Sequence, residues 1–233
     1  MKEMMDALTD GLPRLGLTLT DAQKEKLCEF GAAVIQQNQV MNLTAITDPA
    51  QVGKLHLLDS LTVLTAGDLA GKQLIDVGCG AGFPGVPLAI ACPTLEVTLL
   101  DSLGKRVHWL EQILPALGIP ARCITARAEE AVQFCREQYD VATSRAVARL
   151  NILLELTAPY VRPGGRVIAL KGSAAREELA ECRAALPKLG LQLEALKDFD
   201  FDGAVHTLIV LKKIKPTPAQ DPRRYAKIKQ APL

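Results

Sequence analysis

The sequence predicts an α/β protein built on a mainly parallel β-sheet that ends in an antiparallel hairpin. Short apolar runs alternate with helical segments through the central part of the chain, which is the pattern of successive β-α units. The last two predicted strands, residues 191–198 and 205–212, are joined by only six residues, too few for the helix that a parallel connection requires. These observations predict three parts: an N-terminal helical extension (1–70), a sheet domain (71–213) and a basic C-terminal tail (214–233).

Two helices are expected within the extension, over residues 21–40 and 49–60. Thr20 and Gln23 have the spacing of a capping box, which starts the first helix. Asp48-Pro49 combines a cap with Pro in the first turn and starts the second.

The sheet domain is expected to alternate strands with helices. Its first five strands are predicted at residues 73–76, 95–100, 121–125, 139–143 and 165–170. Three helices are predicted over residues 104–117, 151–160 and 177–186, and two more are predicted to start near residues 84 and 128.

A glycine-rich loop follows the first predicted strand, at Gly78, Gly80 and Gly82. Glycine permits positive φ and lets a ligand lie against bare main chain, and a helix starting near Pro84 directs its amide dipole at that ligand. Such a loop binds either a dinucleotide or S-adenosylmethionine. Because Asp101 lies 19 residues after Gly82, as a dinucleotide site requires, the loop alone leaves both cofactors open.

Asp76, at the end of the first strand, favours S-adenosylmethionine. A buried carboxylate repels a pyrophosphate and attracts an ammonium group, and S-adenosylmethionine carries an amine and a sulfonium without any phosphate. The alternative is a turn Asp that caps the next helix. The terminal hairpin is an independent indication, because it completes the Rossmann-like seven-stranded sheet of class I S-adenosylmethionine-dependent methyltransferases, whereas a dinucleotide domain continues with parallel strands.

Further cofactor contacts are expected at the carboxyl ends of the strands, where pockets of such sheets lie. Asp101 ends the second strand and is expected to accept the ribose hydroxyls, unless it caps the following helix. Arg127-Ala128-Glu129 is expected to border the adenine, although Glu129 is also typical of a charge in a first helical turn. Phe83 is expected to form a wall on the methionine side.

The methyl acceptor is expected to meet the segment after the fourth strand, Ser144 to Arg149. This segment contains neither the Asn/Asp-Pro-Pro-aromatic box of amine methylation nor a Pro-Cys nucleophile. A ring nitrogen with a free lone pair, such as guanine N7, needs only alignment with the methyl group. Arg145 and Lys171 are therefore the candidate catalytic residues, since arginine suits phosphate and the guanine O6/N7 edge. Arg145 could instead form a structural ion pair with a carboxylate. His56 and Asp59, three residues apart, could form an acid–base pair, although such a pair is more often a hydrogen-bonded core contact.

Composition indicates a cytoplasmic protein without disulfides or metal. The six cysteines include no C-x-x-C pair, and no apolar run reaches about 18 residues. Residues 212–229 contain seven basic side chains and one acidic side chain, an arrangement typical of nucleic-acid contact, with a solvated tail as the alternative. Because the cofactor pocket is expected at the glycine loop, truncation after Lys213 is expected to leave cofactor affinity nearly unchanged.

Several motifs together resemble the RsmG family, also called glucose-inhibited division protein B. They are Asn42-Leu43-Thr44, His56 to Leu61, Asp76 to Pro87, Asp101 to Arg106, Ser144-Arg145-Ala146 and Lys171-Gly172. The resemblance implies methylation of guanine N7 in 16S rRNA of the small ribosomal subunit. It also implies cofactor contacts at Gly78, Phe83, Ala128, Glu129 and Arg145. We expect a monomer, and the alternative function is a small-molecule methyltransferase with an incidental basic tail.

Overall fold

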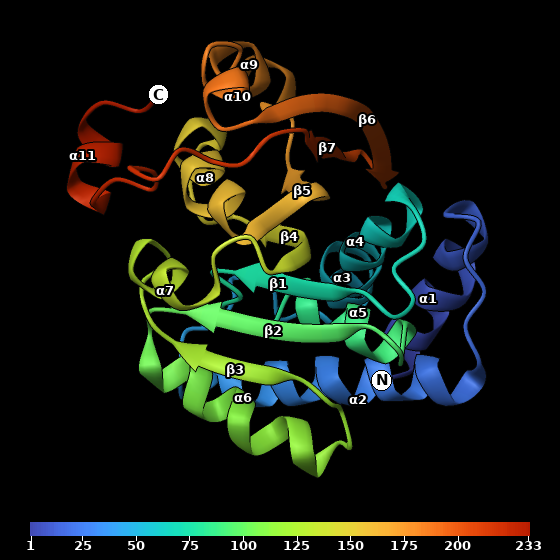
Figure 1. Cartoon of the computed structure of the whole chain (residues 1–233). Helices are drawn as coiled ribbons and strands as arrows, with labels where there is room; N and C mark the ends of the chain where they lie inside the picture. The colour runs from blue at the N-terminus through green and yellow to red at the C-terminus, as the bar shows by residue number, and fades with distance from the viewer.

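Seven strands form one mixed sheet in the order β3-β2-β1-β4-β5-β7-β6 in the computed structural model, which describes residues 1–233 (Figure 1). The first five strands pair in parallel, and β7 is antiparallel to both β5 and β6. The strands are β1 Gln73–Val77, β2 Glu96–Asp101, β3 Arg122–Thr125, β4 Tyr139–Arg145, β5 Val161–Lys171, β6 Leu191–Phe201 and β7 Ala204–Lys213. The predicted fold class is confirmed.

The terminal hairpin is longer than the sequence predicts. Its strands extend to Phe201 and resume at Ala204, so that only Asp202 and Gly203 form the turn. Both turn residues have positive φ, 55° and 89°, as a two-residue turn matched to the twist of a hairpin requires.

Helices cover both faces of this sheet, and no separate helix was predicted over residues 2–14 or 225–230. The α-helices are α1 Lys2–Arg14, α2 Asp21–Asn38, α3 Pro49–Val52, α4 Asp59–Leu61, α5 Gly85–Ala91, α6 Gly104–Ala116, α7 Ala128–Cys135, α8 Leu150–Thr157, α9 Ala175–Glu181, α10 Ala185–Lys188 and α11 Tyr225–Gln230. A π-helix, η1 Gly53–Leu58, and the 3-10 segments η2 Thr62–Ala66 and η3 Ala158–Tyr160 complete the set. No helix is long and apolar enough to span a membrane.

Successive strand residues enter two different cores, as a sheet covered on both faces requires. Leu74 belongs to the same core as Met4 of α1 and Phe30 of α2, whereas its neighbour Ile75 belongs to the core that contains Leu153 of α8. Figure 1 shows α2 and α6 on the same side of β1, β2 and β3. The N-terminal helices therefore share a core with the sheet.

The second predicted N-terminal helix is interrupted. The structure has α3, then the π-helix η1, then α4, where the sequence predicted one helix over 49–60. A π-helix widens the backbone spiral, and such segments are frequent at functional sites. The carbonyl of Leu55 in η1 accepts a hydrogen bond from a distant arginine, described below.

Candidate functional site

The site lies at the carboxyl ends of the parallel strands, where the order reverses between β1 and β4. The loop after β1 turns through Gly78, Gly80 and Gly82, whose φ angles are 74°, 56° and 97°. These positive values favour glycine, because a Cβ would be strained there. The loop is tied to the neighbouring strand, since the N–H groups of Gly78 and Cys79 donate to the Leu100 carbonyl at 2.7 and 3.1 Å.

Two cavities open beside this loop and share part of their walls. The larger has a volume of about 670 Å³ and the smaller about 330 Å³. Gly78, Arg106, Ala146 and Val147 line both. Val147 lies over Gly78, because a Cβ added at Gly78 would be 2.3 Å from Cγ2 of Val147. The two adjoining volumes suit a small ligand that occupies both cavities.

The smaller cavity brings together the residues predicted for adenosine. Asp101, Ala128 and Glu129 all line it. The Asp101 carboxylate accepts the Gly80 N–H at 2.9 Å and the Leu103 N–H at 2.8 Å, one on each oxygen. Leu103 caps α6, so the carboxylate does steady the start of that helix. Each carboxylate oxygen has further lone-pair capacity, which leaves Asp101 able to accept hydroxyl groups as well.

Asp76 lies beneath the loop and is fully buried, outside the lining of both cavities. Its Oδ2 accepts the Gly85 N–H at 2.8 Å, and its Oδ1 has no partner. Burial raises the pKa of this carboxyl group to about 7. Asp76 therefore makes the turn-capping contact that was its alternative interpretation. Its second oxygen has no partner and remains available to interact with a nearby cation.

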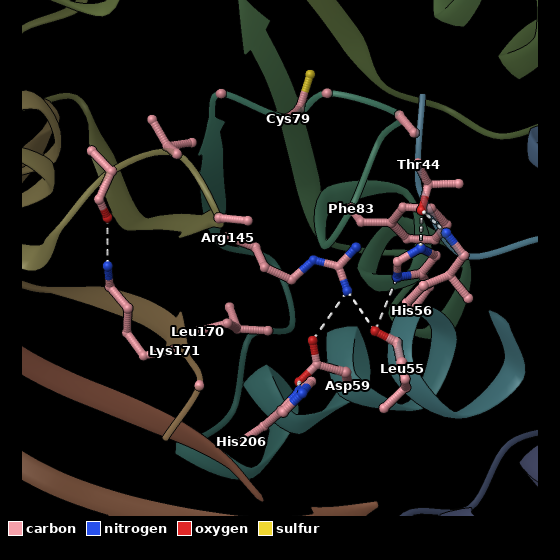
Figure 2. A pocket seen from close by; sticks show the side chains of 18 of the residues that line it. Thr44, Leu55, His56, Asp59, Cys79, Phe83, Arg145, Leu170, Lys171 and His206 are labelled. Atoms are coloured by element: carbon pink, nitrogen blue, oxygen red, sulfur yellow. Dashed lines mark hydrogen bonds and ion pairs between the residues drawn. The ribbon is translucent and has the colours of Figure 1, made fainter. Parts of the chain in front are cut away.

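The larger cavity is organised by a buried ion-pair network (Figure 2). Arg145 Nη1 donates to the Asp59 carboxylate at 3.1 Å and to the Leu55 carbonyl at 2.8 Å. The other oxygen of Asp59 lies 2.7 Å from Nδ1 of His206, a residue of β7. The Arg145 guanidinium also lies over the Phe83 ring, 5.0 Å from its centroid. Arg145 therefore makes the carboxylate pairing that was its alternative interpretation, within the lining of the cavity.

His56 does not form an acid–base pair with Asp59. Its Nδ1 lies 3.0 Å from the Leu55 carbonyl, and its Nε2 lies 2.7 Å from Oγ1 of Thr44. A carbonyl only accepts, so Nδ1 carries the proton and Nε2 accepts from Thr44. Burial, together with the charge of Arg145, lowers the pKa of His56 to about 4, in agreement with a neutral ring. The ring packs on Phe83 at a centroid distance of 4.8 Å, so it is a core contact.

The remaining groups in the larger cavity are also engaged. Lys171 pairs with Glu178 at 2.8 Å and is nearly buried. Asp59 and Glu178 are the only carboxylates in the cavity lining, so each carboxylate there has a cationic partner. Cys79 is buried and its pKa is raised well above its usual value, which keeps it a neutral thiol.

Sequence reasoning gave no role in the site to Thr44, His206 or Tyr225. Thr44 and His206 reach the larger cavity, and Tyr225 of α11 reaches the smaller one. His206 is 147 residues from Asp59, and no local pattern signals that contact. Tyr225 contradicts the expectation that the C-terminal tail lies apart from the cofactor pocket. The basic composition of the tail predicted nucleic-acid contact, with a solvated tail as the alternative, whereas the structure docks the tail against the domain.

The chain is similar over most of its length to ribosomal RNA methyltransferases. A family model described as rRNA small subunit methyltransferase G (GidB) matches residues 23–202. The ribosomal RNA small subunit methyltransferase G of Caldanaerobacter subterraneus subsp. tengcongensis is 42% identical over 240 residues, covering 100% of this chain and 99% of the relative.

Two solved structures show the likeness of fold. The branched-chain polyamine synthase C9 mutein of Thermus thermophilus has a TM-score of 0.61 at 16% identity, covering 82% of this chain and 64% of that chain. TYW2 of M. jannaschii, in complex with AdoMet, has a TM-score of 0.52 at 14% identity, covering 62% of this chain and 70% of that chain.

Proposed function

The chain belongs to the rRNA small subunit methyltransferase G (GidB) family, and from this premise we propose that it methylates N7 of a guanine in 16S rRNA. Family membership makes it an enzyme, an S-adenosylmethionine-dependent methyltransferase that acts on the RNA of the small ribosomal subunit. S-adenosylmethionine supplies an electrophilic methyl group on a cationic sulfur. The residues of the chain bind it, orient the acceptor and exclude water.

The two cavities fit the two halves of this cofactor. Asp101 is placed to accept the ribose hydroxyls, and Ala128 and Glu129 line the same cavity, where the adenine would lie. Gly78, Gly80 and Phe83 line the larger cavity on the methionine side. Above its pKa of about 7 the buried Asp76, whose Oδ1 has no partner, adds negative charge beneath the loop, which favours a cationic ligand over a pyrophosphate.

The paired state of both carboxylates in the larger cavity carries the proposal for N7. Methylation of an amine or a hydroxyl removes a proton, so it benefits from a free base beside the acceptor. Asp59 is held by Arg145 and His206, and Glu178 is held by Lys171. The thiol of Cys79 is buried and neutral, which disfavours covalent catalysis. His206 also lines the cavity, and only its Nδ1 is engaged, by Asp59. A ring nitrogen with a free lone pair is an acceptor that needs alignment alone and gives this imidazole no proton to remove.

Arg145 and Lys171 act in this proposal as the cations that border the acceptor. Arg145 lies against Phe83 and is fixed by Asp59, so its guanidinium presents a preorganised donor surface to the O6/N7 edge of a guanine. Lys171 lies at the end of β5, on the same cavity. We also propose that the protein is a cytoplasmic monomer.

The rival function is methylation of a small molecule. Transfer of a labelled methyl group should be measured with small-subunit RNA, guanosine and GTP offered separately to the same enzyme. We expect label in the RNA and none in the free nucleoside or nucleotide, because phosphate contacts outside the cavity are needed to position the base. If guanosine received as much label as the RNA, the result would support a methyltransferase that acts on small molecules.

A further inference from the structure

The C-terminal tail is fastened to the sheet domain by a buried ion pair. Glu155 of α8 is fully buried, and its carboxylate accepts three hydrogen bonds from Arg223. The donors are the backbone N–H at 3.0 Å, Nε at 2.7 Å and Nη2 at 2.6 Å. A buried carboxylate without its partner is costly, so the pair holds the tail in place. Arg223 is therefore occupied within the protein, contrary to its expected contact with phosphate.

A second set of contacts holds the same segment. Arg136, just after α7, donates to the carbonyls of Thr217, Pro218 and Asp221 at 2.9, 2.7 and 2.8 Å. Ile228 of α11 is fully buried. Figure 1 shows α11 beside α8, at the end of the sheet domain away from the N-terminus. The tail is thus a packed part of the domain.

This docking brings Tyr225 to the cofactor site. Tyr225 follows Arg223 by two positions and opens α11. Tyr225 lines the smaller cavity, together with Asp101, Ala128 and Leu156 of α8. Leu156 is adjacent to Glu155, so the residue that anchors the tail and the residue that lines the cavity are neighbours on one helix.

We propose that Tyr225 is a cofactor-binding residue that closes the adenine end of the site, and that Arg223 and Glu155 are its positioning residues. Tyr225 is the only aromatic residue in a lining otherwise made of aliphatic and small residues, two arginines and two carboxylates, and an aromatic ring beside aliphatic side chains is the surface that a flat heteroaromatic base takes. This inference rests on the S-adenosylmethionine cofactor of the proposed function. It extends the cofactor site to a segment after the last strand.

Calorimetry with S-adenosylhomocysteine and with 5′-methylthioadenosine tests the proposal on the full chain without RNA. Tyr225→Ala should weaken both ligands by the same factor, about tenfold for a lost aromatic contact with a base. Tyr225→Phe should bind as the wild type, and so should Gln230→Ala, an exposed position on the same helix. Unchanged affinity of Tyr225→Ala for both ligands would overturn the proposal.

The positioning role has its own readout. Arg223→Ala should weaken both ligands, and adding Tyr225→Ala to it should cause no further loss, because the ring is already displaced. Fully additive losses would show that Arg223 does not act through Tyr225. In the wild type, S-adenosylhomocysteine should slow amide hydrogen exchange in residues 221–230, and unchanged exchange there would also overturn the proposal.

The affinities of the wild type and of the Tyr225 variants separate the choice of cofactor from the role of the tail. If the wild type bound neither ligand, the cofactor of the proposed function would be wrong. If the wild type bound both ligands and the Tyr225 variants matched it, only the role of the tail would be wrong.

Discussion

Replacing Asp76 by Asn is predicted to change how the stability of the protein depends on pH. The pKa of the buried Asp76 is raised to about 7 from its usual 3.8. Between these values the folded protein holds a proton that the unfolded chain has released, so the free energy of unfolding falls as the pH rises through this window. Three pKa units correspond to on the order of 4 kcal/mol.

The Asn variant has no proton to lose at this position. Its side-chain oxygen can still accept the Gly85 N–H that Asp76 accepts at 2.8 Å. Any constant cost, such as a buried NH₂ without a partner, affects all pH values equally. The unfolding free energy of the variant minus that of the wild type should therefore rise by about 4 kcal/mol between pH 4 and pH 8.

Urea denaturation followed by circular dichroism measures this difference at each pH. The exposed Asp68 provides the matched control, and Asp68→Asn should follow the wild type in parallel. If the unfolding free energies of Asp76→Asn and of the wild type changed in parallel with pH, the reasoning would be refuted, because Asp76 would then hold no proton in the folded state. At pH 8 the same variant should bind S-adenosylmethionine more weakly, by about 1.5–3 kcal/mol for a lost charged interaction.

Three further predictions follow from the same geometry. Gly78→Ala should weaken cofactor binding on the order of 100-fold, because positive φ and the close contact with Val147 both oppose a Cβ. Calorimetry measures the affinity. Gly16→Ala is the control, since Gly16 also has a positive φ, 67°, but no atom lies near the added Cβ. Single-turnover methyl transfer should lack an acidic limb from a protein base between about pH 6 and 9, and a steep loss in that range would indicate an amine or hydroxyl acceptor. Exchanging exposed tail residues for Gln should flatten the salt dependence of RNA affinity by roughly 0.7–0.9 log units per lost phosphate contact, and unchanged slopes would show that these charges do not meet RNA. The residues to exchange are Lys215, Arg224, Lys227 and Lys229.

Local patterns predicted most of the fold because each depends on residues that are close in the chain. Thr20 and Gln23, three residues apart, form both hydrogen bonds of the capping box. The terminal hairpin follows from a short connection that only an antiparallel pair can use. The glycine loop and Asp101 were located because both stand at strand ends, where the chain order alone places a pocket.

Long-range pairs account for what the sequence could not predict. Glu155 lies in an apolar helical segment and gives no sign that Arg223, 68 residues later, will neutralise it. Asp59 and Arg145 are 86 residues apart, so the sequence could only offer pairing as one alternative. The docking of the tail could not be predicted for the same reason, because the sequence shows the positive charge of the tail but not the contact between Arg223 and Glu155.

The position of the methyl group tests the central claim most directly. Small-subunit RNA lacking the modification should be incubated with the enzyme and S-adenosylmethionine, digested to nucleosides and analysed by mass spectrometry against methylguanosine standards. We predict 7-methylguanosine as the product, with none formed by an enzyme that carries Asp101→Ala, because that change removes the acceptor for the Gly80 and Leu103 amides. A methyl group on an exocyclic amine, a ribose hydroxyl or a pyrimidine carbon would contradict the account.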